Sequence, residues 1–318
     1  FFAPYGFLPV ILVVLYIAFG IAEPAFFSAT NALNIINQAS FLVILAAAQM
    51  FALLTRGFDL SLGATVSMVS VASAMIMSAV APGGEGAVVA ALAAGILGGV
   101  LIGMAVGAVN GLCVAYLGIS PFLVTLGVQG VAFGLATTMS GGFPVFDTPL
   151  ILIDWLGSGY WFGVFPPAVA VCLLVLLFCY VVLNHTVLGR SLYILGANPR
   201  AAEVGGLPWR RNNALAYVIC SGIGAVGAVM MMARSGTGEP NLGGGLMLQS
   251  IAAAVIGGVA LRGGEGRVSH VLLGGLLVTV IAIGMNLSRV DGFLQEVVLG
   301  VVVIAAVFLD RLRLRLRL

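Results

Sequence analysis

The chain alternates long apolar runs with short polar connections, and this pattern predicts a series of membrane-spanning helices. An α-helix needs about 20 apolar residues to cross a bilayer. By this criterion ten spans are predicted, near residues 7–22, 40–55, 62–80, 88–117, 122–140, 162–184, 211–234, 247–262, 268–286 and 292–309. The runs at 40–55 and 247–262 are short enough to be broken or re-entrant, and the run at 88–117 is long enough to tilt or kink.

The amino-acid composition narrows the fold class. Of the 318 residues, 61% are hydrophobic and 8% are charged, whereas soluble domains carry about 25% charged residues. A surface with so little charge cannot keep a globule of this size in water. The sequence therefore predicts an all-α polytopic membrane protein in which residues 1–318 form a single transmembrane domain. The net charge of +2 gives no indication of nucleic-acid binding.

The placement of arginine predicts the orientation in the membrane. All thirteen basic residues are arginine, and cytoplasmic loops of membrane proteins are enriched in positive charge. With the N-terminus in the cytoplasm, the cytoplasmic side collects Arg56, Arg190, Arg200, Arg210, Arg211, Arg262, Arg267, Arg311, Arg313, Arg315 and Arg317. Arg234 and Arg289 remain outside. Both termini and the polar loop 185–211 are therefore expected in the cytoplasm.

One predicted span carries a regular glycine stripe. Gly95, Gly99, Gly103, Gly107 and Gly111 are spaced four apart, so on a helix they lie on one face. Such a face allows a neighbouring backbone to approach closely. Tight helix packing is the favoured interpretation, and a groove that carries a solute is the alternative.

The loop 185–211 contains a second pattern, ANPRAAEVGG. Asn198 is a good N-cap, Pro199 suits the first helical position, and Gly205–Gly206 provides a stop. The helix between them has about six residues, roughly 9 Å long, and is too short to be stable alone in water. It needs a surface, which is either the membrane end of this chain, as in an ordinary connector, or a cytoplasmic partner.

The sequence carries no energy source of its own. A nucleotide-hydrolysing P-loop needs a lysine in G-x-x-x-x-G-K-[ST], and the chain has no lysine, so it is not predicted to be an ATPase or another enzyme. Ion-coupled carriers place ionisable residues inside the membrane. Here every Asp and Glu maps to a loop or the end of a span, so the membrane core is expected to be bare of charge. The cysteines form no metal-ligand pattern.

Four stretches, in order along nearly the whole chain, resemble the ribose-type permeases of bacterial ABC sugar importers. They are TRGFDLSLGATVS (55–67), NGLCVAYLGISPFLVTLG (110–127), LGRSLYILGANPRAAEVGGL (188–207) and SIAAAVIGGVALRGGEG (250–266). The last stretch departs from the family pattern E-L-D-A-I-A-A, because Met247 and Gln249 stand at the acidic positions.

The resemblance implies a fold of about ten helices, of the ribose and branched-chain amino acid type, in the bacterial inner membrane. It implies a permease subunit that translocates a monosaccharide delivered by an external binding protein. The implied partners are a second permease subunit, identical or homologous, and two cytoplasmic ATPases that hold ATP and magnesium. This chain itself is expected to need no cofactor. The loop 185–211 would supply the coupling helix that docks on the ATPase, with Asn198, Pro199, Arg200, Ala201, Ala202, Glu203, Gly205 and Gly206.

Two further sets of residues are candidates for function. The first of the four stretches, TRGFDLSLGATVS, is the signature stretch and contributes Gly57, Asp59, Ser61 and Gly63. Asp59 is interpreted as the N-cap of the 62–80 helix, with contact to the solute or gating as the alternative. Asn110, Phe122, Gln129 and Asn286 are candidates to line the translocation pathway. Each amide among them could equally be buried and hydrogen-bonded between helices.

Two other classes of membrane protein remain as alternatives. A secondary carrier or facilitator would work without an ATPase partner and would be expected to hold an intramembrane charge. A membrane enzyme would need a clustered catalytic set, but His185 and His270 lie far apart in the sequence. Both alternatives are weaker than the permease.

Overall fold

A computed structural model describes residues 8–82, 87–146, 148–157, 159–161, 163 and 165–316, without the side chains of 303, 306, 307 and 309–316. Arg317 lies outside this range. The helices are α1 (Leu8–Ala22), α2 (Ala29–Leu54), α3 (Leu62–Val80), α4 (Val88–Ala115), α5 (Pro121–Ser140), α6 (Leu150–Leu152), α7 (Pro167–His185), α8 (Val187–Ala197), α9 (Pro199–Val204), α10 (Trp209–Ser235), α11 (Leu246–Ile256), α12 (Val268–Leu287) and α13 (Gly292–Leu316), with a 3-10 turn at Pro24–Phe27 and a π-helical turn at Ile153–Gly157.

The predicted all-α membrane fold is confirmed, because each of the ten predicted spans coincides with a helix. Of the described helices, seven are long and apolar enough to cross a membrane. With 11 residues, α11 is about 16 Å long and too short to cross, as expected of a re-entrant element. The expectation of a broken helix at 40–55 was wrong. There α2 is continuous from Ala29. The Ser28 side chain caps the helix by accepting from the Asn31 N–H, so the helix begins in the polar stretch that precedes the apolar run.

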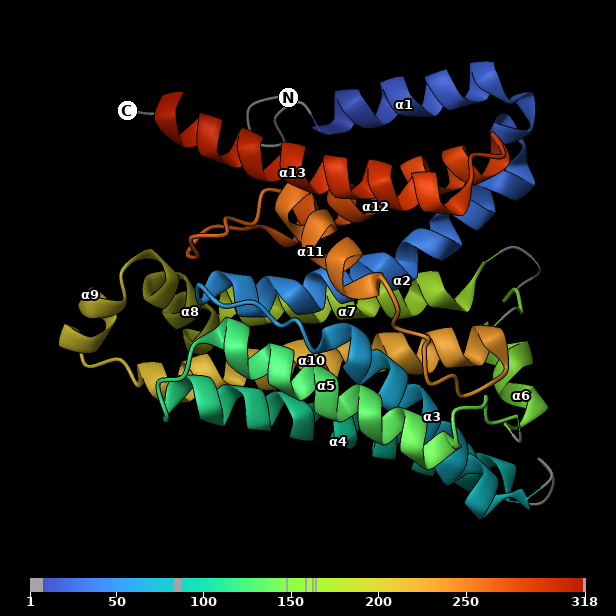
Figure 1. Ribbon diagram of the computed structural model, residues 1–318, viewed down its shortest axis with the longest axis horizontal. Coiled ribbons are helices and arrows are strands. Elements are labelled where there is room, and N and C mark those ends of the chain that lie inside the picture. The colour runs from blue at the N-terminus through green and yellow to red at the C-terminus, as the bar shows by residue number, and fades with distance from the viewer. Residues whose placement is uncertain are drawn as a thin grey trace.

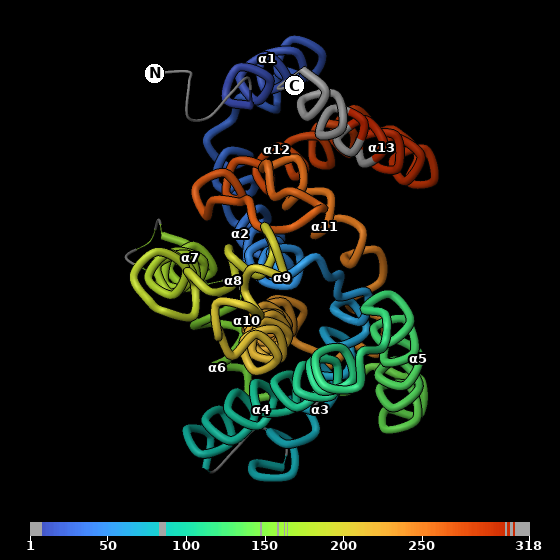
Figure 2. The backbone as a smooth tube through the Cα atoms, turned by 90° about the vertical axis from the view of Figure 1, so that its left-hand side faces the viewer, coloured from blue at the N-terminus to red at the C-terminus, as the bar shows by residue number. Residues whose placement is uncertain are grey.

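The helices cross the bundle in alternating directions (Figure 1). Helix α9 and the described end of α13 lie at one end, which we call the α9 end. The α6 region and the end of α10 lie at the opposite end, which we call the far end. Viewed along the bundle, α2 and α10 lie near the centre, α7 on one side, and α5 and α13 on the other (Figure 2). The described start of α1 faces the α9 end, as the described end of α13 does (Figure 1). The first and last described helices therefore have these ends on the same side of the bundle, as the arginine pattern predicts.

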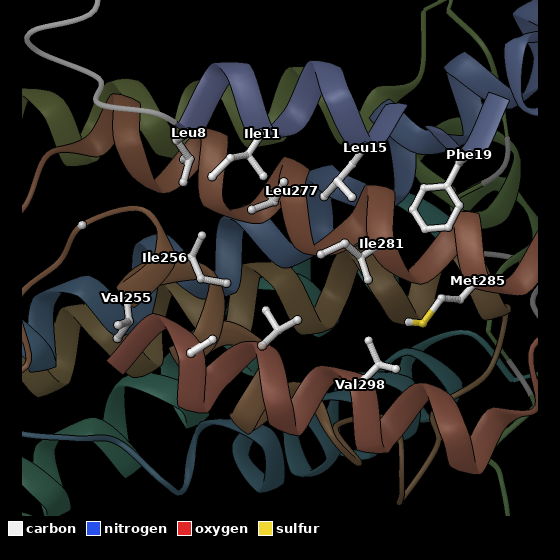
Figure 3. A pocket seen from close by; sticks show the side chains of 13 residues that line it. Leu8, Ile11, Leu15, Phe19, Val255, Ile256, Leu277, Ile281, Met285 and Val298 are labelled. Carbon is white, nitrogen blue, oxygen red and sulfur yellow. The ribbon is translucent and has the colours of Figure 1, made fainter. Parts of the chain in front are cut away.

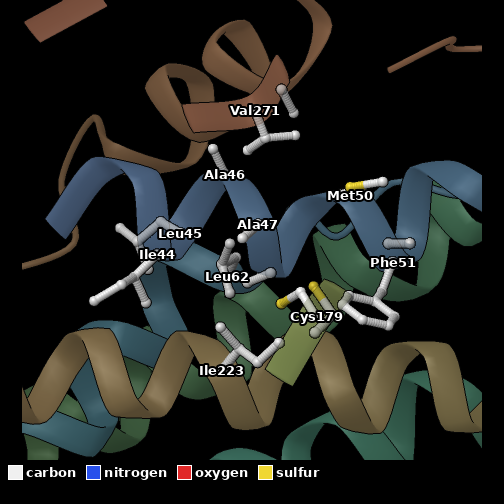
Figure 4. Packing of buried hydrophobic residues seen from close by; sticks show 14 of the residues in the cluster. Ile44, Leu45, Ala46, Ala47, Met50, Phe51, Leu62, Cys179, Ile223 and Val271 are labelled. Carbon is white, nitrogen blue, oxygen red and sulfur yellow. The ribbon is translucent and has the colours of Figure 1, made fainter. Parts of the chain in front are cut away.

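Helix α2 forms the centre of the core. Every residue from Ser40 to Leu54 is buried, and a helix that is apolar all round is expected to be enclosed on all sides. In Figure 4 its side chains point toward α3, α7, α10 and α12, where Leu62, Cys179, Ile223 and Val271 meet them. This packing gives the re-entrant parts of the chain a fixed wall to fold against.

The two halves of the chain repeat one another with opposite orientation. Helices α2 and α10 begin 180 residues apart, at Ala29 and Trp209, and so do α4 and α12, at Val88 and Val268. Each long helix is followed by a left-handed residue, Arg56 with φ 65° and Gly236 with φ 73°. Helix α2 packs on α11 and α12, and α10 packs on α3 and α4. In Figure 1 α2 and α10 run in opposite directions, so the halves form an inverted repeat around these two helices.

The glycine stripe of α4 is a packing surface, as favoured from the sequence. A Cβ at Gly95 or Gly99 would meet side chains of α3, and a Cβ at Gly103, Gly107 or Gly111 would meet the backbone of α10. All five glycines are buried. The stripe therefore provides the close approach between α4 and α10 and leaves no groove along this face.

We expect Gly107→Ala to lower the free energy of unfolding by about 1–3 kcal/mol, because the new methyl group overpacks a close helix contact. Its Cβ would lie 2.8 Å from the Val218 Cα. The matched control is Gly130→Ala in α5, where a Cβ would meet nothing within 4 Å and alanine favours the helix. Thermal unfolding of the purified chain in detergent measures both; equal midpoints for the two variants would contradict the assignment.

Candidate functional site

A buried polar junction surrounds Asp59, in the segment 55–61 that connects α2 to α3; we call this the first re-entrant segment. The Asp59 side chain is 0% exposed. Its Oδ1 accepts hydrogen bonds from the Ser61 N–H at 3.0 Å and the Ser61 hydroxyl at 2.5 Å, and from the Asn110 amide at 3.3 Å. Its Oδ2 accepts from the Ser221 hydroxyl at 3.1 Å. Ser221 lies 12 residues beyond the start of α10, about 18 Å along that helix, so the segment folds back into the bundle.

This geometry corrects two predictions. Asp59 is not the N-cap of α3: Ser61 holds that position, and its side chain makes no capping bond. The membrane core is also not bare of ionisable groups, because Asp59 lies inside it. Hydropathy assigned residues 55–61 to a surface loop, yet the loop turns inward and supplies the donors that a buried carboxylate needs.

The two glycines of the signature stretch allow close packing of both re-entrant segments, Gly57 in the first and Gly63 of α3 against the second. A Cβ at Gly57 would collide with the hydroxyl of Tyr217 on α10. A Cβ at Gly63 would lie 2.7 Å from the Gly243 carbonyl oxygen. The sequence grouped Gly57, Asp59, Ser61 and Gly63 as one structural signature, and the structure brings all four into one packed region.

A second non-helical segment, residues 236–245, runs back into the bundle along α3; we call it the second re-entrant segment. The Glu239 N–H donates to the Ser70 hydroxyl at 3.1 Å, and the Gly243 N–H donates to the Ser67 hydroxyl at 2.9 Å. Non-helical backbone at membrane depth is tolerated only where such partners exist. The two serines of α3 therefore hold the start of α11 inside the bundle.

Helix α9 forms at the residues that the sequence indicates. The Asn198 Oδ1 accepts from the Ala201 N–H at 3.1 Å, and Pro199 occupies the first turn. The helix ends at Gly205, and Gly206 adopts a left-handed φ of 70°. Ala202 is fully buried beneath the helix. Arg200, Ala201, Glu203 and Val204 face outward, and Val204 is 82% exposed.

The end of α8, which forms the base of α9, contacts the first re-entrant segment and the loop that links α11 to α12. Arg56, directly before the signature, donates from Nε to the Gly196 carbonyl oxygen at 2.6 Å and from Nη2 to the Ala197 carbonyl oxygen at 2.7 Å. On the other side the Gly264 N–H donates to the Leu54 carbonyl oxygen at 3.0 Å. A Cβ at Gly196 would collide with Leu54 and Gly264. The end of α8 is thus wedged between the end of α2 and the loop that links α11 to α12.

The four pathway candidates do not form one site. Asn110 is 0% exposed and donates to Ser61 Oγ at 2.8 Å and to Asp59, so it is a buried amide, the alternative left open from the sequence, and lines no open path. Phe122 is 54% exposed at the start of α5. Gln129 is half-buried in the middle of α5, and Asn286 is exposed near the far end of α12.

Several residues of this region were not singled out from the sequence. Arg56 binds the end of α8, Gly264 binds the end of α2, and Ser67 and Ser70 bind the second re-entrant segment. Ser67 and Ser70 could have been recognised from the sequence, because a spacing of three places both hydroxyls on one face of an apolar helix. Arg56 has none, since its role depends on a contact 140 residues away.

We expect Asp59→Leu to lower the free energy of unfolding by about 3–5 kcal/mol, because it leaves buried donors of Ser61, Asn110 and Ser221 without an acceptor. Asp59→Asn keeps one acceptor oxygen and should cost less. The control is Asp291→Leu: Asp291 is exposed and accepts one bond, from the Phe293 N–H at 2.9 Å, so its loss costs about 1 kcal/mol. Unfolding midpoints in detergent test the order; a wild-type midpoint for Asp59→Leu would refute the junction's role.

Comparison with known proteins adds the family. Residues 31–307 match the model for the branched-chain amino acid transport system / permease component family. The chain is 34% identical over 302 residues to the ribose import permease protein RbsC of Bacillus subtilis (strain 168), covering 94% of this chain and 90% of that protein.

Two further relatives come from Escherichia coli (strain K12). The D-allose transport system permease protein AlsC is 33% identical over 303 residues, covering 95% of this chain and 90% of that protein. The galactose/methyl galactoside import permease protein MglC is 30% identical over 319 residues, covering 96% and 93%. No solved structure matches the chain. The family model spans most of the sequence, and the chain belongs to this family of transport-system permease components.

Proposed function

We propose that this chain is the membrane-spanning subunit of an ATP-driven bacterial importer and that it translocates a monosaccharide delivered by an external binding protein. The family membership supports a permease component of a transport system. The relatives named for ribose, allose and galactose support a sugar over an amino acid as the solute. The chain contains no lysine for a P-loop, which supports hydrolysis of ATP with magnesium in a partner subunit and no cofactor in this one.

The observation that carries the proposal is the outward face of α9 on a base braced by Arg56 and Gly264. A six-residue helix cannot hold its shape alone, yet α9 presents Arg200, Glu203 and Val204 to its surroundings. The opposite charges of Arg200 and Glu203 on this face can pair with complementary charges on a partner. Residues Asn198 to Gly206 then form the contact with an ATPase.

The contacts at the base of α9 connect the ATPase contact mechanically to the membrane-spanning helices. A push on α9 is passed through the end of α8 to Arg56 and Leu54 on one side and to Gly264 on the other. Arg56 lies in the first re-entrant segment, which leads into α3, and α11 ends at Ile256, shortly before Gly264. Closure of two cytoplasmic ATPases would therefore move α3 and α11 relative to the long helices α2 and α10.

A second permease subunit, identical or homologous, fits the side of the bundle formed by α5 and α13 (Figure 2). Helix α5 buries only Val124, Thr125, Ala132 and Ala136. A spanning helix with so few partners in its own chain offers its remaining surface to lipid or to another subunit.

The arginine distribution supports an orientation with the α9 end in the cytoplasm. Arg200, Arg210 and Arg211 lie in or beside α9, whereas Arg234 and Arg289 lie at the ends of α10 and α12 on the far side. Positive charge favours the cytoplasmic face. Both termini are then cytoplasmic, and the far end of the bundle receives the binding protein.

The carrier alternative is the second candidate, because Asp59 is an ionisable group inside the bundle. A coupling carboxylate must exchange a proton or ion with a water-filled path. Asp59 is fully enclosed, and donors of this chain occupy both of its oxygens. The junction is therefore better explained as the support for the first re-entrant segment.

Reversing the charges on α9 should remove ATPase binding and leave the fold intact. We expect Arg200→Glu combined with Glu203→Arg to reduce co-purification of the ATPase and uptake by at least about tenfold, since charge pairs at an interface lose roughly this much when reversed. The control is Arg289→Glu at the far end, which should change neither. Unchanged uptake with the α9 reversal would sink the coupling assignment.

Arg56→Ala should separate ATPase binding from transport. The variant keeps the outward face of α9 but removes both hydrogen bonds to the end of α8. We expect ATPase co-purification to persist while uptake per ATP hydrolysed falls by about tenfold. Arg56→Gly relieves the left-handed φ of 65° and should lose uptake equally, which excludes strain as the cause. Arg262→Ala, in an exposed ion pair with Glu265, should have little effect.

A further inference from the structure

The bundle contains two cavities of opposite chemistry among α1, α2 and α10 to α13. The larger, about 560 Å³, lies between α1, α11, α12 and α13. Figure 3 shows that its walls are hydrocarbon with the Met285 sulfur, as suits a surface that contacts lipid. The smaller, about 360 Å³, lies between α2, α10, α11 and α12 near the far end. Its lining includes Gln38, Phe41, Arg234, Ser235, Gln249 and Thr279, and we call it the polar cavity.

Arg234 lies against an aromatic wall of the polar cavity. Its guanidinium carbon is 5.5 Å from the centroid of the Phe41 ring, a distance at which the cation is attracted to the ring face. This contact does not use the N–H groups of the exposed guanidinium. Those groups remain available as donors, and the ring edge and neighbouring Leu42 provide apolar contact.

Two glutamine amides complete the polar wall. Among the described residues, the side-chain amides of exposed Gln38 and half-buried Gln249 have no hydrogen-bond partner, and both border the cavity. An amide both donates and accepts, and so does a sugar hydroxyl. Gln249 stands where the resemblance implies an acidic residue, so in this chain an uncharged group occupies the wall that also holds Arg234.

The charge of the lining discriminates between solutes. The described residues around the polar cavity include Arg234 and no Asp or Glu. A zwitterionic amino acid could place its carboxylate on Arg234, but its ammonium group would then meet a wall that has a cation and no carboxylate to receive it. An uncharged polyhydroxylated solute meets no such penalty, because amides, hydroxyls and a guanidinium all bind its oxygens.

The volume and position agree with one small solute on its way inward. Ligand pockets span about 300–1,000 Å³, so about 360 Å³ fits a single monosaccharide rather than an oligosaccharide. Leu242 belongs to the second re-entrant segment, and Leu246 and Gln249 belong to α11. These elements continue to Gly264 and the base of α9, so movement of α9 would reshape this wall.

We propose that the polar cavity is a low-affinity subsite for an uncharged polyhydroxylated solute of monosaccharide size, held by Gln38, Gln249 and Arg234 against Phe41. The proposal rests on the proposed sugar transport and locates the solute inside this chain. Gln249 is then a residue that determines solute specificity.

The test compares binding with transport. Saturation-transfer NMR on the purified chain, with millimolar D-ribose, D-allose, D-galactose or L-leucine as probes, measures binding. Gln38→Leu and Gln249→Leu remove the amides and keep similar volume, and each should weaken sugar binding about tenfold. The matched control is Gln295→Leu, in α13 outside the cavity, whose Nε2 donates to the Val290 carbonyl oxygen at 2.9 Å; it should bind as the wild type does.

ATP-driven uptake by the complete assembly in proteoliposomes, with the same probes, separates the two proposals. Sugar binding without uptake would keep the subsite and overturn sugar import. Uptake of a sugar that the wild-type chain does not bind would overturn the subsite and keep import. Preference for L-leucine, equal loss in Gln295→Leu, or absence of both sugar binding and uptake would overturn the subsite.

Discussion

The constraint on which this structure depends is that non-helical backbone inside a membrane bundle must find hydrogen-bond partners within the protein. Two segments of this chain meet it in different ways. The Asp59 carboxylate accepts from Ser61, whose hydroxyl in turn accepts from Asn110, while serine hydroxyls of α3 accept from the backbone of the second segment. Because these bonds exist, α3 and α11 can begin inside the bundle rather than at its surface. The same arrangement, a long central helix followed by a re-entrant segment, occurs in both halves of the inverted repeat around α2 and α10.

This arrangement also makes the middle of the bundle sensitive to movement at the α9 end. Arg56 lies three residues before Asp59 and binds the last carbonyl groups of α8. Leu54, at the end of the most buried helix, accepts from Gly264 in the other half of the repeat. A short helix whose base is held at these two points cannot move without moving the first re-entrant segment and the loop that follows α11. The rigid core and these two short connections together convert a movement of α9 at the surface into a movement of α3 and α11 inside the membrane.

The sequence predicts the helices of this fold well, because hydropathy reports how long each apolar run is. It also predicts α9, since Asn198, Pro199 and the Gly205–Gly206 pair carry local capping chemistry, and it predicts the packing face of α4 from glycine spacing. It does not predict the depth of Asp59. A polar stretch between two apolar runs has the same hydropathy whether it lies in water or folds back among helices, and only contacts with Asn110 and Ser221 distinguish the two. The same limit applies to Gln249, whose neighbours in the polar cavity come from four separate helices.

The buried junction and the polar cavity divide the work of the proposed transporter. Asp59 is enclosed by donors from its own chain, so it has no capacity left to recognise a solute, and a change of solute would not require a change there. The side chains of the polar cavity are bound less completely, and an exchange of Gln249 for a carboxylate would alter the charge that a solute meets without disturbing the re-entrant segments. A family described for branched-chain amino acids whose relatives here are named for sugars is consistent with this division. The scaffold can stay constant while a few cavity residues select the solute.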